Sequence, residues 1–108
     1  MAIALTEPIE TYFAAVNGDD VDGALGCFEE DATVRDERRT IRGRTDIRRW
    51  IVDTKMKYQH TIQPLKSATE DDKVIVTSRL SGSFPGSPVD ARFAFVLRGG
   101  KISSLEIR

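Results

Sequence analysis

Residues 73–98 read KVIVTSRLSGSFPGSPVDARFAFVLR, and this segment decides the fold class. One set of alternate positions holds Val74, Val76, Ser78 and Leu80 before the central turn, and Val89, Ala91, Phe93, Phe95 and Leu97 after it. A pattern with a period of two is typical of β-strands. The intervening FPGSP at 84–88 is rich in turn-forming residues, so the segment predicts two antiparallel strands.

Two further turn signals flank this pair of strands. Glu70-Asp71-Asp72 precedes the pair and Gly99-Gly100 follows it, and each connection is short enough for a hairpin. The second half of the chain therefore predicts four antiparallel strands, near residues 58–69, 73–83, 88–98 and 101–108.

The first half of the chain has a helical period. Apolar side chains recur at i, i+3, i+4 and i+7 in three segments, which are Ile9 to Val16, Val21 to Phe28, and Ile47 to Thr54. Between the second and third segments we predict a brief strand at 32–34 and an arginine-rich loop that runs to Gly43. Three helices followed by an antiparallel sheet form an α+β domain with the helices on one face. Three short helices over a long curved sheet leave room for a cavity.

The composition is that of one globular domain spanning residues 1–108, with 40% hydrophobic and 31% charged residues. The lone Cys27 can form no internal disulfide and reads as a small buried hydrophobic residue. The apolar run at 1–5 has no preceding basic residue and ends at Glu7-Pro8, so no signal peptide is predicted. No segment approaches the roughly 20 apolar residues of a membrane helix. We expect a cytoplasmic protein without a membrane partner.

Charge is balanced overall but unevenly distributed, with 16 basic residues, 17 acidic residues and a net charge of −1. The first 31 residues contain no Lys or Arg, whereas arginines are dense between Arg35 and Arg49. Acidic residues interrupt this arginine run, and no aromatic residues alternate with it to stack on bases. We therefore do not expect a nucleic-acid partner, and we expect the arginines to pair with the acidic N-terminal helices.

The order of elements, together with the strings FEEDATVRD at 28–36 and GRTDI at 43–47, resembles the nuclear transport factor 2-like (NTF2-like) superfamily. Within it, the chain is most similar to the small SnoaL-like polyketide cyclases and to the ketosteroid isomerases. The resemblance covers essentially the whole chain and implies a cone-shaped, cystatin-like fold. The superfamily also includes dehydratases, epoxide hydrolases, non-catalytic ligand binders and adaptors, so the fold alone does not name the reaction.

The resemblance to ketosteroid isomerases implies roles for individual residues. Asp36 stands where those enzymes have their general base, Tyr12 where they have the oxyanion-hole tyrosine, and Trp50 where the third helix presents an aromatic side chain. The protonated aspartate of the oxyanion hole maps to Phe93, which has no proton to donate. The tyrosine that supports the oxyanion hole maps to Ile51. Steroid isomerisation itself is therefore not expected.

Each candidate catalytic residue also has an ordinary structural interpretation. Asp36 is either a base on an apolar cavity or a turn residue paired with neighbouring arginines, which would weaken it as a base. Tyr12 is either a hydrogen-bond donor to substrate or a core tyrosine. His60, on a predicted strand, is either an acid or base that works with Asp36 or a structural histidine.

The remaining aromatic residues suggest an apolar ligand site formed by Trp50, Phe93, Phe13 and Phe84, although the same residues could serve as core. No metal ligands cluster and no glycine-rich nucleotide loop is present, so no metal or cofactor is predicted. Three functions stay open: a cofactor-free isomerase or cyclase, a binder of small apolar ligands, and a dimeric scaffold whose pocket Phe93 and Trp50 fill. We also expect a homodimer through the outer face of the sheet, formed by Ala94, Val96, Leu105 and Ile107.

Overall fold

A computed structural model describes residues 5–108 and contains three helices and six strands. The helices are α1 (Glu7–Asn17), α2 (Val21–Leu25) and α3 (Arg44–Tyr58). The strands are β1 (Phe28–Asp36), β2 (Arg39–Arg42), β3 (Thr61–Glu70), β4 (Lys73–Ser81), β5 (Val89–Arg98) and β6 (Lys101–Ile107). Apart from Leu5, the N-terminal run used in the signal-peptide argument lies outside the described residues.

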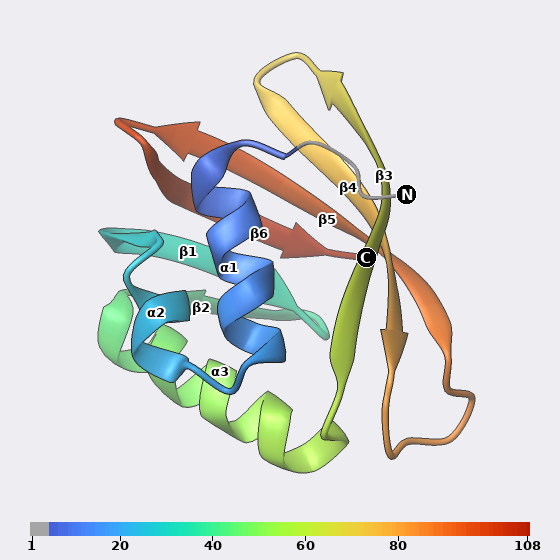
Figure 1. Cartoon of the computed structure of the whole chain (residues 1–108). Coiled ribbons are helices and arrows are strands. Elements are labelled where there is room, and N and C mark those ends of the chain that lie inside the picture. The colour runs from blue at the N-terminus through green and yellow to red at the C-terminus, as the bar shows by residue number, and fades with distance from the viewer. Residues whose placement is uncertain (1–4) are drawn as a thin grey trace.

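The strands form one sheet in the order β2-β1-β6-β5-β4-β3. The four C-terminal strands pair antiparallel as predicted, but β1 and β6 run parallel, so the sheet is mixed and not wholly antiparallel. Figure 1 shows the sheet twisting strongly between β1 and β3, with the helices on one side of it. The three-helix α+β cone expected from the sequence is confirmed.

The region between α2 and α3 differs most from the sequence prediction. The brief strand expected at 32–34 extends from Phe28 to Asp36, and the expected arginine-rich loop contains β2. The two strands form a tight hairpin because Glu37 and Arg38 both adopt positive φ, at 51° and 65°. Ile41 is the only apolar residue of β2 and pairs with Val34, which gives too short a pattern to recognise.

Local sequence explains where the helices begin and end. Gly18 follows α1 as its C-cap. The Asp20 carboxylate accepts a hydrogen bond from the Gly23 amide at 2.9 Å and caps α2. The second helix is shorter than predicted, since α2 ends at Leu25 and Phe28 already belongs to β1. Gln59, in a left-handed conformation, ends α3.

Aromatic rings form the centre of the core between α1 and the sheet. The Phe95 side chain is fully buried, and its ring centroid lies 6.0 Å from that of Tyr12 and 5.7 Å from that of Phe13. Phe28 meets Tyr12 edge-on at 5.6 Å. Cys27 is buried, as expected. These contacts fix α1 against the sheet and thereby position Tyr12.

Strand register corrects the argument for a homodimer. Leu105 pairs with Phe95 and Ile107 with Phe93, so both lie on the inner, helix-covered face of the sheet. Only Ala94 and Val96, of the four residues expected at a dimer interface, lie on the outer face, and Ala94 is already buried within one chain. The sheet-mediated homodimer therefore has weaker support than the sequence suggested.

A sheet-mediated homodimer stays a prediction, and a solution mass tests it. Sedimentation at micromolar concentration is expected to give twice the chain mass of 12.0 kDa. Val96→Glu, which adds a charge to the outer face, is expected to shift the equilibrium toward monomer, because burying an unpaired charge is unfavourable. A monomeric mass for the wild type at these concentrations would rule the dimer out.

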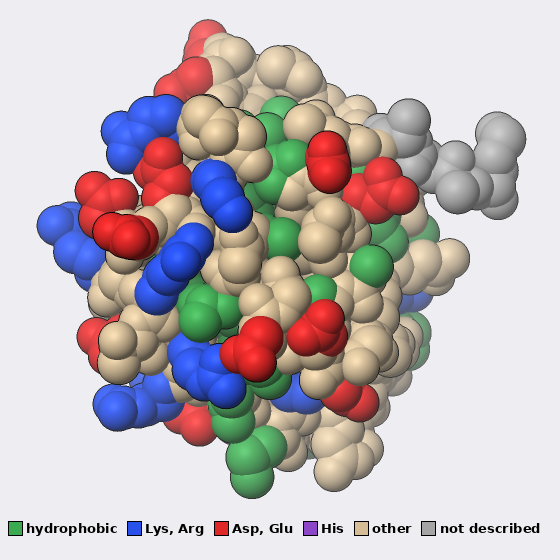
Figure 2. Space-filling model, turned by 60° about the vertical axis from the view of Figure 1, so that its left-hand side comes forward, with side chains coloured by type: hydrophobic (Ala, Val, Ile, Leu, Met, Phe, Trp, Pro, Cys, Tyr) green, Lys and Arg blue, Asp and Glu red, His purple; other side chains and the backbone are tan. Residues whose placement is uncertain are grey.

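Two ion pairs join α3 to acidic residues in and just before α2. Arg48 on α3 pairs with Asp22 on α2, and Lys55 pairs with Asp19 at 3.4 Å. Figure 2 shows basic and acidic side chains interspersed over the face that it presents. The pairing between Arg48 and an acidic N-terminal helix agrees with the sequence-based expectation.

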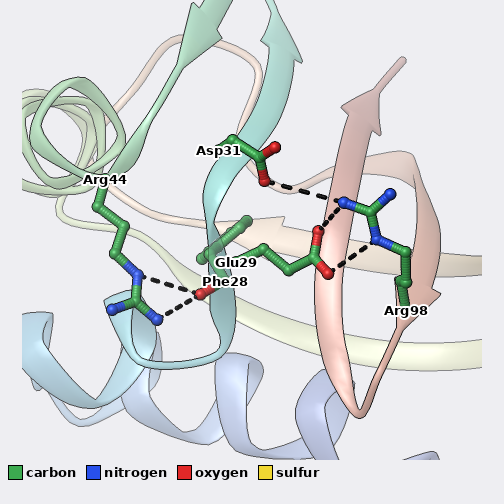
Figure 3. Close-up of polar contacts among 5 residues, drawn as sticks. All are labelled: Phe28, Glu29, Asp31, Arg44 and Arg98. Atoms are coloured by element: carbon green, nitrogen blue, oxygen red, sulfur yellow. Dashed lines mark hydrogen bonds and ion pairs between the residues drawn. The ribbon is translucent and has the colours of Figure 1, made fainter.

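A second group of polar contacts secures the start of β1 (Figure 3). Pairing between β1 and β6 shifts register between Phe28 and Thr33. There the Phe28 carbonyl oxygen accepts hydrogen bonds from Arg44 Nε at 3.1 Å and Nη2 at 2.6 Å. Arg98 donates to both carboxylate oxygens of Glu29, at 3.0 and 2.7 Å. Arg44 is the first residue of α3, so this contact joins the helix directly to the strand that carries Asp36.

No helix within residues 5–108 has both the length and the apolar character needed to cross a membrane.

Candidate active site

A cavity of about 280 Å³ lies between α1, α3 and the inner face of the sheet. Its wall is mostly apolar and is built from α1, α3, the end of β1, strands β3 to β6, the connection before β3 and the loop before β5. The polar side chains on the wall include Asp36, Tyr12 and His60, the three residues that the sequence proposed for chemistry. The fold therefore brings these three candidates, which are distant in sequence, to one cavity.

Asp36 ends β1 and faces the cavity. One of its carboxylate oxygens, Oδ2, accepts a hydrogen bond from the Trp50 indole Nε1 at 3.0 Å. Partial burial raises the pKa of the Asp36 carboxyl above its ordinary value, and the Trp50 hydrogen bond opposes this rise. An oriented carboxylate with a raised pKa in apolar surroundings is suited to accept a proton.

The raised pKa of Asp36 predicts a dependence of stability on pH. A carboxyl group whose pKa is higher in the folded state stabilises the fold when protonated, and this stabilisation is lost as pH rises through the folded-state pKa. Asp36→Asn removes the titration. The free energy of unfolding of Asp36→Asn is therefore expected to increase relative to that of the wild type as pH rises from 4 to 7. Urea unfolding measures both values.

The exposed Asp53 on α3 supplies the matched control for this titration. Asp53→Asn removes an exposed carboxylate from the same helix and reports the general effect of losing one negative charge, which is expected to stay within about 0.5 kcal/mol. An Asp36→Asn free energy of unfolding that falls relative to that of the wild type as pH rises would contradict the burial of the Asp36 carboxyl.

Tyr12 reaches the cavity from α1. Its side chain is 2% exposed, and its ring packs between Phe28 and Phe95. Burial raises the pKa of the Tyr12 hydroxyl, and the nearby Asp36 carboxylate raises it further. The phenol therefore stays protonated at neutral pH and can donate a hydrogen bond. Tyr12 is at once a core residue and a residue of the cavity wall.

His60 lies on the cavity wall but not on a strand. The predicted strand at 58–69 begins only at Thr61, because α3 continues to Tyr58 and a two-residue connection follows. Burial lowers the pKa of the His60 imidazole, and the nearby Lys55 ammonium lowers it further. Its Nδ1 atom is buried without a hydrogen-bond partner. The imidazole is therefore neutral at physiological pH.

The four predicted ligand-contacting aromatic residues divide three to one. Trp50, Phe93 and Phe84 line the cavity. Phe13 lies instead in the core beside it, with its ring centroid 5.4 Å from that of Phe93 and 5.7 Å from that of Phe95. Phe13 is on the same helical face as Tyr12. Helical spacing alone therefore could not show that Tyr12 lines the cavity whereas Phe13 lies in the core.

Sequence reasoning missed a polar pair on the cavity wall. The Tyr58 hydroxyl donates a hydrogen bond to Glu37 Oε1 at 2.5 Å, and the Tyr58 ring meets Phe84 edge-on at 5.6 Å. The sequence pattern predicts that Tyr58 begins a strand. Glu37 lies in a turn where no hydrophobic periodicity indicates the direction of its side chain. Only the helix stop at Gln59 could have indicated that Tyr58 belongs to α3.

Within residues 5–108, no three His, Cys, Asp or Glu side chains group together as a metal site would require. Beside the Tyr58–Glu37 pair, the polar groups of the cavity include one oriented carboxylate, one buried phenol and one neutral imidazole. Such a set can accept a proton from carbon and donate hydrogen bonds to a carbonyl oxygen.

Comparison with known proteins agrees with this architecture. Residues 9–105 match the SnoaL-like domain family. A Sinorhizobium meliloti protein assigned as a polyketide cyclase is 36% identical, with a TM-score of 0.93 over 96% of this chain and 95% of that chain. The epoxide hydrolase/cyclase-like enzyme SalBIII is 27% identical, with a TM-score of 0.80 over 94% of this chain and 86% of that chain.

More distant structures share the fold alone. An NTF2-like protein from Cytophaga hutchinsonii is 18% identical, with a TM-score of 0.78 over 100% of this chain and 91% of that chain. No curated protein matches the sequence. Since the family match spans nearly the whole chain, the chain belongs to the SnoaL-like domain family.

Proposed function

We propose that this protein is a cofactor-free isomerase or cyclase that transfers a proton on a small, largely apolar carbonyl compound. One observation carries the proposal: the Asp36 carboxylate, oriented by Trp50, lies on the wall of a mostly apolar cavity that raises its pKa. The similarity to the S. meliloti polyketide cyclase supports a cyclase class. SalBIII, the more distant cyclase-like relative, has a role in pyran ring formation in the polyether salinomycin.

In the proposed reaction, the Asp36 carboxylate removes a proton from the carbon next to the substrate carbonyl. The electron pair of that C–H bond forms a carbon–carbon double bond, and the carbonyl π pair moves onto oxygen to give an enolate. The Tyr12 hydroxyl donates a hydrogen bond to this oxygen as charge develops. Where the substrate has a carbon–carbon double bond next to the deprotonated carbon, the enolate is a dienolate. Return of the proton from Asp36 to the far carbon of that double bond then moves the double bond into conjugation with the carbonyl. Alternatively, the enolate carbon attacks a second carbonyl carbon of the same molecule and closes a ring. The alkoxide formed on that second oxygen then takes the proton held by Asp36.

Deuterium incorporation tests the proton-transfer step without knowledge of the natural substrate. Enolisable ketones of increasing size, such as cyclohexanone, 1-tetralone and 2-tetralone, are incubated with the protein in D₂O and followed by NMR. We expect exchange of the α-protons above the buffer rate for at least one ketone. Exchange at the buffer rate for every ketone that binds would reject the proposal.

The alternative is a protein that binds the same class of compound without turning it over. Phe93, which stands where a proton donor would strengthen an oxyanion hole, favours this alternative. It predicts that thermal unfolding shifts upward with ligand while α-proton exchange stays at the buffer rate. The scaffold hypothesis required Phe93 and Trp50 to fill the pocket, and an open cavity between α1, α3 and the sheet counts against it.

A further inference from the structure

Among residues 5–108, the cavity wall contains five side chains able to donate a hydrogen bond, and three of them already bond to protein acceptors. The Trp50 indole donates to Asp36, and the Tyr58 hydroxyl donates to Glu37. The Thr54 hydroxyl donates to the Trp50 carbonyl one turn earlier on α3. A ligand in the cavity cannot use these donors without breaking an existing bond.

The two remaining donors are Tyr12 and His60, and the burial of the His60 ring decides which nitrogen is available. Nδ1 is sealed from solvent and has no hydrogen-bond partner. A proton on Nδ1 would be a buried donor without an acceptor, which is less favourable than an unpartnered lone pair. The neutral ring therefore carries its proton on Nε2, the nitrogen that is not sealed.

The backbone around His60 holds the ring in place. The Lys55 ammonium donates to the His60 carbonyl oxygen and also to the Val16 carbonyl at 3.1 Å, which ties the loop to α1. Gly82 packs so closely on the loop that a Cβ there would lie 2.9 Å from His60 Cα. The Tyr58 ring lies edge-on to the imidazole, 6.3 Å between centroids. Two of these contacts anchor the backbone at His60 and the third lies against the ring, so the imidazole projects from a well-anchored loop.

We propose that the His60 Nε2–H group is the second hydrogen-bond donor to the substrate oxygen, alongside the Tyr12 hydroxyl. It would take the role of the protonated aspartate of ketosteroid isomerases, at whose position this chain has Phe93. This deepens the proposed function and rests on it for the catalytic role. While Asp36 takes the carbon proton and charge moves onto the carbonyl oxygen, His60 and Tyr12 donate hydrogen bonds and keep their protons. His60 then acts as a neutral electrophile, not as an acid or base.

The tautomer is measured on the wild-type protein, so this test does not depend on a variant that folds. Long-range ¹H–¹⁵N correlation of the imidazole distinguishes a protonated Nε2 from a protonated Nδ1. We expect the neutral Nε2–H form at pH 7. A ring protonated on Nδ1, or on both nitrogens, would overturn the proposal.

Oxyanion binding tests the role directly. 4-Nitrophenolate at about pH 8 represents the enolate, and nitrobenzene is its uncharged counterpart. Asp36→Asn represents the state in which the base has accepted its proton, so binding is measured in that background. Adding His60→Leu is expected to weaken 4-nitrophenolate binding by about 10-fold to 100-fold, as for loss of a hydrogen bond to a charged group. Nitrobenzene affinity is expected to change little, and His60→Gln, which keeps an N–H, is expected to restore part of the loss.

Equal losses for both ligands would reduce His60 to a packing residue and overturn the proposal. Unchanged affinity for both would do the same. Combining His60→Leu with Tyr12→Phe is expected to give a loss that differs from the product of the single losses, because both groups bind one oxygen. Strict multiplication of the two losses would place the donors on different atoms.

Failure of this inference is distinguishable from failure of the proposed function. If the wild type catalyses α-proton exchange but His60→Leu leaves exchange and phenolate binding intact, the function stands and the role of His60 falls. If the wild type catalyses no exchange yet binds phenolate through His60, the oxyanion site stands and the enzyme proposal falls.

Discussion

Asp36→Asn is expected to lower the rate of α-proton exchange by about 10²-fold to 10⁴-fold, the usual contribution of a positioned general base. Asparagine keeps the size of the side chain, and its carbonyl oxygen can still accept the Trp50 hydrogen bond. It cannot accept a proton from carbon at neutral pH. The variant therefore removes the chemistry while leaving the cavity wall in place. NMR in D₂O with the best ketone of the panel measures the effect.

The same substitution should preserve binding and folding. Since the pKa of the Asp36 carboxyl is raised by burial, its removal as a charge favours the fold at neutral pH. Asp53→Asn, on the exposed side of α3, is expected to exchange protons at the wild-type rate. If the Asp36→Asn protein catalysed α-proton exchange as fast as the wild type, the general base would have to be another group.

Phe95→Ala is expected to reduce the free energy of unfolding by about 3–5 kcal/mol. The Phe95 side chain is fully buried and contacts the rings of Tyr12, Phe13 and Phe93. Truncation leaves a void where α1 meets the sheet. Since small domains have only about 5–15 kcal/mol of stability, this loss is a large share of the total. Urea unfolding followed by circular dichroism measures it.

Met56→Ala supplies the contrast to this core truncation. Its side chain is 74% exposed on α3, and the change is expected to stay within about 0.5 kcal/mol. If Phe95→Ala destabilised the protein no more than Met56→Ala, the aromatic cluster would not be what holds α1 on the sheet. The position of Tyr12 would then need another explanation.

The elements with a long regular period could be predicted from the sequence. The alternation around Phe93 and the helical spacing of Ile9, Tyr12 and Val16 correctly predict β5 and α1. Short or irregular elements could not be predicted in this way. In β2, a single apolar residue, Ile41, gives no pattern, and its pairing with β1 depends on two residues in the left-handed region.

The sequence could predict a residue of the candidate site only where the periodicity of its own helix or strand shows on which side the residue lies. The resemblance in sequence selects Asp36, Tyr12 and Trp50, and all three line the cavity. The hydrogen bond between Trp50 and Asp36 joins two elements, so periodicity within either element cannot reveal it. For the same reason the sequence placed Leu105 and Ile107 on the wrong face, which only the register with β5 decides.

The parallel pairing of β1 with β6 also bears on how the chain folds. Of the strands that the structure describes, β6 comes last in the sequence, yet it lies inside the sheet and alone joins the β1–β2 hairpin to β5. The two halves of the sheet thus stay separate until β6 pairs with β1. These two strands are far apart in the sequence, so their pairing forms slowly compared with local contacts. During that interval β1 and β5 have open edges that another chain can join. Pairing of β6 with β1 within one chain therefore competes with pairing between chains during refolding. Because only pairing between chains depends on concentration, the refolding yield falls as protein concentration rises.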